Sequence, residues 1–442
     1  MYNYETLQND DDIRLIELPP AALALSGSKL NISLLTFAHR DTPNYEALSY
    51  VWGDPSNPVT INVNGQDMLI GRNLHDALTH IRHEHQSRKL WIDAICINQS
   101  DNNEKSKQVS RMRDIYSNST STVMWIGMQD GLQAPVLEHI RDIHDSDIWM
   151  PKSGPTMPAL SGQLIPIPGP LQMMFGNDML TSLGTLWDQT YFSRSWITQE
   201  IAVSAHLVLV CGTFQFDFDR LMEVSEAICD HSTIKLRNHD LADSFISIRR
   251  NVRQHIDEME ETSGSDEGKN NNTSVDCRYS STLPYLLQLL SVRRDQNATD
   301  ARDKVYAFLG IARDSKTLDI QPHYSMSANE LYTAVAAKLI DRYGPSVLST
   351  CQPNYSTLGL PSWVPDWSQP WRDGIERRDI FECGTSLQKE VRMDTQDGTI
   401  AISGIVLDVV RGTDGTPFDT WGPEPWKLLD MPDTLEEQMT KI

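Results

Sequence analysis

The chain has 442 residues, and 60 acidic against 38 basic residues give it a formal net charge of −22. Such a field repels phosphate and anionic lipid, so the composition argues against binding to nucleic acid or to a membrane surface. No run reaches the roughly 18 apolar residues that a membrane span needs, and the first residues lack a signal-peptide pattern. With six cysteines and no CxxC pair, we expect a cytoplasmic protein with reduced thiols.

Three nearly continuous apolar runs predict the central strands of the fold. They cover residues 47–53, 90–98 and 122–127. Continuous rather than alternating apolar residues are typical of strands that are covered on both faces, as in a parallel sheet. A fourth buried strand is expected over 206–212. Helical periodicity between the runs completes an α/β pattern.

The segments between these strands predict one hairpin and two helices. Asn-Gly at 64 and 65 favours a tight turn, so residues 59–70 are expected to form a β-hairpin. A helix is expected over 73–85, with Asn73 as its N-cap and an apolar stripe along one face. The same periodicity predicts a second helix over 104–119.

The pattern changes along the rest of the chain. Residues 150–180 are rich in Pro, Met and Gly and are expected to form a long inserted loop. Farther on, helical patterns dominate, with a polar, disordered linker near 258–280 and a few short strands beyond it. We therefore expect an α/β domain over 1–215, with core motifs at 45–127 and 191–212, and a mainly helical region over 216–442.

The predicted carboxyl ends of the strands carry polar residues or glycine. The first strand ends in Trp52 and Gly53, the second in Asn98 and Gln99, and the third in Gly127. In open parallel sheets ligands bind beyond these ends. The sequence therefore predicts a ligand crevice at this edge.

Two carboxylates stand among apolar residues, and each has a structural and a functional interpretation. Asp93 is either a hydrogen-bonding residue of the fold or part of a site that faces a cavity. Glu200 is either paired with Arg194, or capped by backbone, or it is an acid tuned by its surroundings for chemistry. Trp196 lies four residues earlier and shares a helical face with Glu200, where it is either core or a ligand platform.

The sequence lacks the features that identify several common kinds of active site. Cys96 lies between two isoleucines and is expected to be an inert buried thiol. The histidines of the first predicted helix have no carboxylate at a zinc spacing, so we expect no metal site. The chain has no GxxxxGK[ST], GxGxxG or GxSxG pattern, which argues against a P-loop ATPase, a Rossmann dehydrogenase and an α/β-hydrolase.

Four long motifs carry a family resemblance. In order and spacing they resemble the successive motifs of the fungal heterokaryon incompatibility (HET) domain, and two later segments resemble pieces that commonly follow that domain. The four motifs are YEALSYVWGD (45–54), LWIDAICINQ (90–99), KQVSRMRDIYSNSTSTVMWIG (107–127) and FSRSWITQEI (192–201), and the later segments are 300–312 and 360–368.

The resemblance implies a role in fungal nonself recognition, in which the HET domain triggers growth arrest or cell death. HET domains are also distantly similar to TIR domains, which implies a TIR-like or flavodoxin-like parallel sheet flanked by helices. In TIR enzymes a Glu four residues after a Trp is the catalytic residue that splits NAD at the nicotinamide bond. Glu200 matches that position, four residues after Trp196. The resemblance therefore implies that NAD or a related nucleotide is a substrate and that the protein has no bound cofactor.

The TIR likeness implies a set of substrate-binding residues. Tyr50, Trp52 or Trp196 would stack on nicotinamide or adenine, and Arg194 or Arg72 would meet the pyrophosphate. Asp93 within the second predicted strand completes the set together with the strand-end residues Gly53, Asn98 and Gln99.

Two other functions stay open at this point. One is a non-enzymatic module that acts by self-association or by binding a protein partner, with the motif residues serving only as core. The other is a HET protein recruited to a different small-molecule role. The sequence does not distinguish them from the enzyme.

Overall fold

A mixed sheet with flanking helices is followed by a mainly helical region, so the predicted α/β class is confirmed. The computed structural model describes residues 2–23, 29–128, 183–212, 214–231, 239–264, 283–352, 358–371, 391–394 and 399–402.

Within the described ranges, the sheet has nine strands in the order β5-β4-β2-β1-β6-β3-β7-β8-β9. The adjacent strands β6, β3, β7 and β8 run parallel, and among the other pairs only β2 with β4 is parallel. The strands are β1 (Ile13–Leu18), β2 (Asn31–Phe37), β3 (Glu46–Tyr50), β4 (Val59–Val63), β5 (Gln66–Ile70), β6 (Arg88–Trp91), β7 (Thr122–Gly127), β8 (Leu207–Cys211) and β9 (Phe214–Asp217).

The parallel strands follow the order of a flavodoxin-like sheet. By their place in the chain, β3, β6, β7 and β8 are the first to fourth, and they lie side by side in the order second, first, third, fourth. After β3 the chain therefore forms β6 on one side of β3, and it later forms β7 on the opposite side. In such sheets ligands bind where this reversal occurs, beyond the carboxyl ends of β3 and β7.

The sequence pattern predicts neither β1 nor β2. Strand β1 lies between β2 and β6 and is buried along almost its whole length, so it lacks a clean alternation. Arg14 within it donates to the carbonyl of Cys96 (3.0 Å) and forms an ion pair with Glu104 (2.6 Å). A guanidinium is tolerated inside a strand only with such partners, and these are distant in sequence.

Three local expectations in this part were wrong. The strand expected over 90–98 ends at Trp91, and a helix begins at Asp93. The single helix expected over 104–119 is two helices that break at Arg111 (φ −101°, ψ 0°). The helices of this part are α1 (Arg72–His80), α2 (Asp93–Cys96), α3 (Asn102–Ser110), α4 (Met112–Ser117), α8 (Ile197–Val203) and the 3-10 turns η1 (Ala21–Leu23), η2 (His39–Asp41) and η3 (Thr190–Ser193).

The third correction concerns the first predicted helix. Helix α1 begins at Arg72 with Gly71 as its N-cap, and no side chain caps it. Asn73 instead donates to the carbonyl of Val51 (2.6 Å) and accepts from Trp125 Nε1 (2.9 Å). It therefore ties the end of β3 to β7 across the point where the chain direction reverses.

The rest of the described chain is mainly helical. Of the expected linker, residues 258–264 belong to α10, while its remainder and the Pro-rich segment 150–180 lie outside the described residues. The elements are α9 (Phe218–His231), α10 (His239–Gly264), α11 (Leu286–Val292), α12 (Asp303–Leu309), α13 (Ser315–Leu318), α14 (Ala328–Tyr343), η4 (Gly344–Thr350), β10 (Val391–Asp394) and β11 (Thr399–Ile402).

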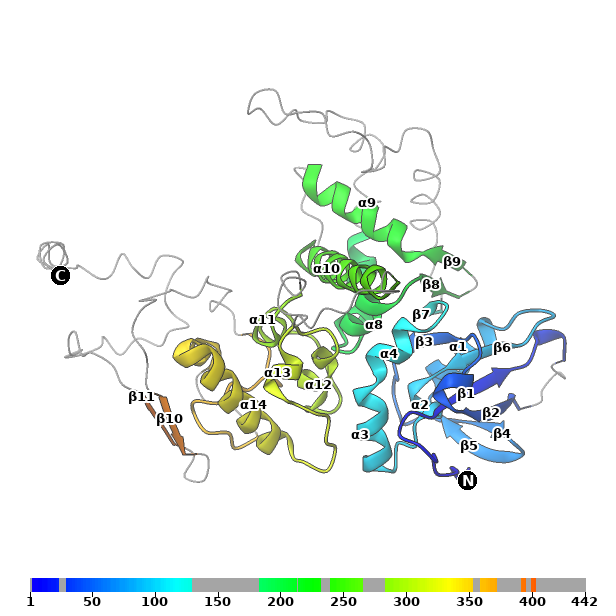
Figure 1. Ribbon diagram of the computed structural model, residues 1–442. Coiled ribbons are helices and arrows are strands. Elements are labelled where there is room, and N and C mark those ends of the chain that lie inside the picture. The colour runs from blue at the N-terminus through cyan, green and yellow to red at the C-terminus, as the bar shows by residue number, and fades with distance from the viewer. Residues whose placement is uncertain are drawn as a thin grey trace, which may run out of the picture.

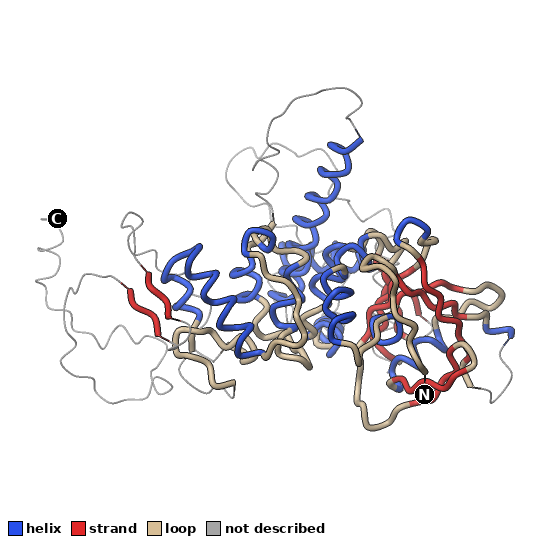
Figure 2. The backbone as a smooth tube through the Cα atoms, turned by 60° about the horizontal axis from the view of Figure 1, so that its bottom comes forward, coloured by secondary structure: helices blue, strands red, loops and turns tan. Residues whose placement is uncertain are grey.

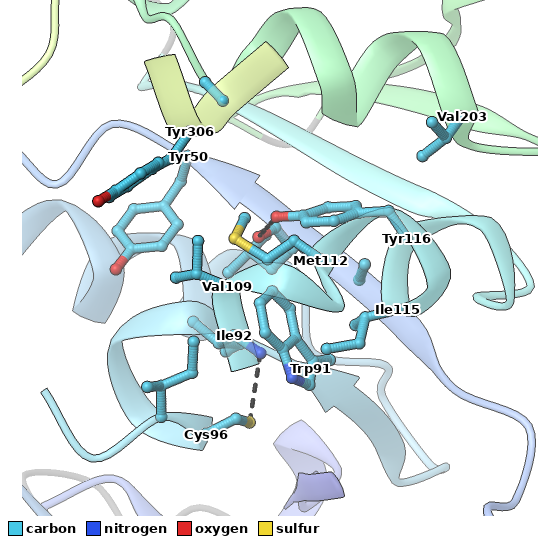
Figure 3. Close-up of a cluster of buried hydrophobic side chains, with 14 of the residues drawn as sticks. Tyr50, Trp91, Ile92, Cys96, Val109, Met112, Ile115, Tyr116, Val203 and Tyr306 are labelled. Atoms are coloured by element: carbon cyan, nitrogen blue, oxygen red, sulfur yellow. Dashed lines mark hydrogen bonds between the residues drawn. The ribbon is translucent and has the colours of Figure 1, made fainter. Parts of the chain in front are cut away.

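The sheet and the helical region pack against each other. Helices α3 and α4 lie between the nine-stranded sheet and helices α12 to α14 (Figure 1). A second view shows the strands of this sheet gathered at one end of the molecule, with β10 and β11 at the opposite end (Figure 2). One buried cluster extends from Ile13 to Trp367 and so includes side chains from both regions. Where α4 meets the sheet, Trp91 packs edge-on against Tyr116, with ring centroids 5.5 Å apart (Figure 3).

Cys96 is one of the residues of this core (Figure 3). It is 1 % exposed, and its Sγ accepts a hydrogen bond from the backbone N–H of Ile92 (3.3 Å). Burial raises the pKa of the thiol to about 12. The expectation of a buried thiol is confirmed, and the raised pKa supports the prediction that it is unreactive.

Candidate active site

Glu200 lies in the middle of α8 with its carboxylate directed into the protein. The residue is 2 % exposed, and Ser49 Oγ, on β3, donates to its Oε2. The hydroxyl of Tyr191 lies 2.6 Å from the same Ser49 Oγ. Burial raises the pKa of Glu200 against the opposing effects of Arg194 and the Ser49 hydrogen bond. The carboxyl group is therefore held in a site that disfavours its charge.

Arg194 is the cation nearest to this carboxylate. Its Nη1 lies 3.8 Å from Glu200 Oε2, and among the described residues this buried nitrogen has no hydrogen-bond partner. Burial lowers the pKa of Arg194, but Glu200 and Asp93 outweigh this effect and raise the pKa overall. The expected pairing of Glu200 with Arg194 thus exists only as a loose contact that leaves guanidinium donors unused.

Asp93 joins the same electrostatic cluster from the carboxyl end of β6. It is the first residue of α2, where its Oδ1 accepts from the N–H of Ala94 (2.7 Å) and its Oδ2 from Trp52 Nε1 (3.0 Å). Burial raises its pKa in spite of the attraction of Arg194. The sequence placed Asp93 inside a strand, whereas the helix start gives its carboxylate a backbone N–H to accept from.

Exposed apolar side chains follow both strands at the point of chain reversal. Trp52, two residues beyond β3, is 44 % exposed, and Met128, directly after β7, is 55 % exposed. Because the indole N–H of Trp52 is held by Asp93, the ring is anchored at one edge. An anchored, half-exposed indole can stack on a planar ligand.

Asn98 and Gln99 hold the loop after α2. Gln99 Nε2 donates to the carbonyl of Asp93 (2.9 Å), and the N–H of Asn98 donates to Glu104 Oε1 (2.7 Å). Their contacts fix the backbone beside Asp93. A role for these two side chains in contacting a ligand stays a prediction.

The other predicted binding residues differ in their exposure and contacts. Tyr50 is 3 % exposed, so it belongs to the wall of the cluster. Gly53 has a φ of +75°, a conformation that favours glycine, directly after Trp52. Arg72 is exposed at the start of α1, with Asn57 as its contact (3.5 Å). Trp196 is half-buried, and its side chain makes a hydrogen bond that lowers the pKa of Asp303.

The sequence reading missed two side chains of this cluster, Ser49 and Tyr191. Ser49 faces α8 from within an apolar strand, and Tyr191 reaches it from η3. A lone serine inside the buried ALSY run was a usable signal, because a buried hydroxyl needs a partner. Nothing local identified that partner, since Ser49 and Glu200 are 151 residues apart.

The helical region holds the segment that carries Arg194 and Glu200. Asn297 donates its N–H to the carbonyl of Ser193 (2.5 Å) and accepts from the N–H of Ser195 (2.9 Å). Thr198 Oγ1 donates to Gln296 Oε1 (2.9 Å). These bonds fix the backbone on both sides of Arg194.

The cluster as a whole combines two carboxylates of raised pKa with one buried guanidinium. Burial is the main cause of both raised pKa values, and the charge of Asp93 adds to the raised pKa of Glu200. Such a group can stabilise a developing cation when ionised or hold a proton when neutral.

Comparison with known proteins shows which family this part of the chain is similar to. Residues 45–200 match the family model of the heterokaryon incompatibility protein (HET). The chain is 26 % identical over 469 aligned residues to heterokaryon incompatibility protein 6, OR allele, of Neurospora crassa, and the match covers 93 % of this chain and 66 % of that protein. The chain thus spans about two thirds of the length of this curated relative. No solved structure matches it.

The described helices include none that is long and apolar enough to cross a membrane.

The resemblance drawn from the four motifs is confirmed, because the family match begins at the first of them and ends at Glu200. The matched residues 45–200 carry Ser49, Asp93, Arg194 and Glu200, so this cluster lies within the part of the chain that is similar to the heterokaryon incompatibility family.

Proposed function

We propose that this chain is a cytoplasmic fungal protein of nonself recognition whose HET domain triggers cell death by cleaving NAD or a related nucleotide. The family match and the name of the Neurospora relative support the recognition role. The observation that carries the catalytic part is the buried Glu200 carboxylate beside an incompletely bonded Arg194.

The proposed chemistry assigns Glu200 to the ribose of the substrate. Cleavage of a nicotinamide–ribose bond passes through an oxocarbenium-like transition state, which a nearby carboxylate stabilises. Desolvation of Glu200 strengthens that interaction, because a charge in a dry site acts through a low dielectric. The ionised carboxylate is needed for this step, so activity should fall as the pH drops through the raised pKa of Glu200.

The remaining groups have roles that fit a nucleotide. The unused donors of Arg194 suit a phosphate oxygen, which a guanidinium binds with directional hydrogen bonds. The exposed ring of Trp52 suits a nicotinamide or adenine ring. The flavodoxin-like order of β6, β3, β7 and β8 supports a ligand crevice at this edge of the sheet.

A second function, an interaction or self-association module, is favoured by a different observation. Glu200 is 2 % exposed and Ser49 already donates to it, so its carboxylate is not open to solvent. The exposed Trp52 and Met128 would then be contact residues for a protein partner or a second copy.

Nicotinamide release from NAD by the purified protein decides between the two. Glu200→Gln keeps the shape of the side chain and should abolish release, while Glu46→Gln is a matched control in the ion pair with Arg88. Wild-type protein that releases no nicotinamide at high concentration, with and without forced clustering, would favour the interaction module.

A further inference from the structure

A polar cavity lies in the helical region, and its lining contains none of the residues of the Glu200 cluster. Its volume is about 280 Å³. The loop over 294–301 forms most of the lining, and Lys304, Ser368 and Pro370 complete it. This size is near the lower end of the roughly 300–1,000 Å³ of small-molecule sites.

Arg294 is the first of two buried cations that line this cavity. It is 2 % exposed, and its guanidinium donates hydrogen bonds to three backbone carbonyls. Nε donates to Gln369 (2.9 Å), Nη1 to Thr350 (2.6 Å) and Nη2 to Asp366 (2.7 Å). The guanidinium is therefore well bonded without being neutralised.

Lys304, near the start of α12, is the second buried cation. It is 5 % exposed, and its ammonium donates to the carbonyls of Arg294 (2.6 Å) and Gln296. An ammonium has three donors, so one N–H is left for a further acceptor.

The cavity wall carries positive charge without a contacting counter-ion. Among the described residues, neither Arg294 nor Lys304 has a carboxylate at ion-pair distance. Burial lowers the pKa of Arg294 to about 10 and of Lys304 to about 8, although Asp295 and Asp366 act in the opposite direction from farther away. Buried charge without a partner is unfavourable, and an anion in the cavity would relieve it.

The rim of the cavity offers neutral donors. Asn297 and Thr299 are exposed, and Asn297 Nδ2 uses one of its two hydrogens on Ser193 Oγ (3.2 Å). Asp295 is also exposed at this rim, where its Oδ1 accepts from the N–H of Trp371 (2.8 Å). An anion bound at the wall would therefore meet an amide and a hydroxyl on its outer side.

We propose that this cavity binds a small oxyanion, a carboxylate or a phosphate monoester, through the free N–H of Lys304 and the rim side chains of Asn297 and Thr299. The site does not rest on catalysis by Glu200. It is nevertheless connected to that residue, because the backbone of Asn297 holds Ser193 and Ser195 on either side of Arg194. An anion that orders this loop would also order the segment before α8.

Binding is measured by isothermal titration calorimetry with inorganic phosphate and, separately, with acetate, against sodium chloride at equal ionic strength. We expect saturable binding of at least one of the two oxyanions and none of chloride, and the stronger of the two identifies the head group. Thr299→Asp places a negative charge on the exposed rim and should weaken binding roughly tenfold or more. Thr317→Asp adds the same charge at an exposed position of α13 and should leave binding unchanged.

A lysine pair provides a second test. Lys304→Met should abolish binding, whereas Lys338→Met should preserve it, because Lys338 also donates to two backbone carbonyls, those of Leu318 and Asp319, but does not line the cavity. If Lys304→Met fails to fold, Thr299→Asp decides alone. The proposal is overturned if neither oxyanion binds saturably, or if Thr299→Asp binds as tightly as Thr317→Asp.

Discussion

Arg194 Nη1 lies 3.8 Å from Glu200 Oε2 and has no hydrogen-bond partner among the described residues. A buried ion pair selected for stability normally has direct, often bidentate hydrogen bonds, because these offset the cost of desolvation. Here the two groups face each other with donors unused and with a second carboxylate, Asp93, in the same field. This arrangement fits the ligand site that is proposed above, because donors of Arg194 are left for a further acceptor.

Replacing Arg194 tests its electrostatic role. Arg194→Gln removes the cation that lowers the pKa of Glu200, so this pKa should rise further. If ionised Glu200 supports nicotinamide release, the acidic limb of the pH–rate profile moves to higher pH. Arg82→Gln is the control, because that guanidinium binds the carbonyls of Pro19 and Pro20 far from the cluster. An unshifted profile in Arg194→Gln would show that the two groups are not coupled.

Trp52 tests the proposed platform for a planar ring. The side chain is 44 % exposed, so Trp52→Ala should change the free energy of unfolding by less than about 1 kcal/mol. Nucleotide affinity should fall by roughly tenfold, which corresponds to the stacking of one ring. Trp52→Phe keeps a ring but loses the hydrogen bond to Asp93, and should retain most of the affinity. Leu69→Ala, 52 % exposed on β5, is the control; equal affinities in all variants would remove Trp52 from the site.

Gly310 tests how closely the helical region packs against α8. A Cβ at this position would overlap the side-chain oxygen of Gln199, the residue before Glu200. The backbone there has an ordinary helical conformation (φ −70°), so Gly310→Ala adds no backbone strain and its cost comes from the overlap with Gln199. We expect a loss of about 1–3 kcal/mol in urea unfolding, as for other overpacked sites. Gln199→Ala should restore stability to the double variant, and a lack of rescue would contradict this explanation.

Asp303 should make stability depend on pH. Burial raises its pKa to about 6, although Tyr324 and Trp196 oppose this with hydrogen bonds. A raised folded-state pKa means that the stabilising contribution is complete at low pH and is lost as the pH rises through about 6. Asp303→Asn should therefore flatten the fall of melting temperature in that range. The exposed Asp341→Asn should keep the wild-type slope, and an equally steep fall in Asp303→Asn would show that Asp303 does not titrate there.

The sequence predicted the elements that depend on local pattern. The apolar runs identified β3, β7 and β8, and the Asn-Gly pair identified the hairpin of β4 and β5. The spacing of Trp196 and Glu200 indicated a shared helix turn, and the N–H of Glu200 does donate to the carbonyl of Trp196 (3.2 Å). These features follow from side-chain periodicity and turn chemistry alone.

The contacts that define the site could not be predicted from local sequence patterns. Strand β1 is recognisable only through its pairing with β2 and β6, and Asp93 begins a helix although its neighbours read as strand. Asn297 meets Ser193 across 104 residues, a separation at which no periodicity operates. The polar residues within apolar segments indicated where the site lies, whereas their hydrogen-bond partners are visible only in the tertiary structure.

The most direct test of the central claim is the free energy of unfolding of wild type and Glu200→Gln, measured in urea at about pH 5 and pH 8. Because burial raises the pKa of Glu200, its ionised form opposes folding, and stability should be lost as the pH rises through that pKa. The account predicts that Glu200→Gln is at least as stable as wild type at the higher pH, while nicotinamide release is lost. A variant that is destabilised by about 2 kcal/mol or more at both pH values would contradict it and make Glu200 a structural residue of the core.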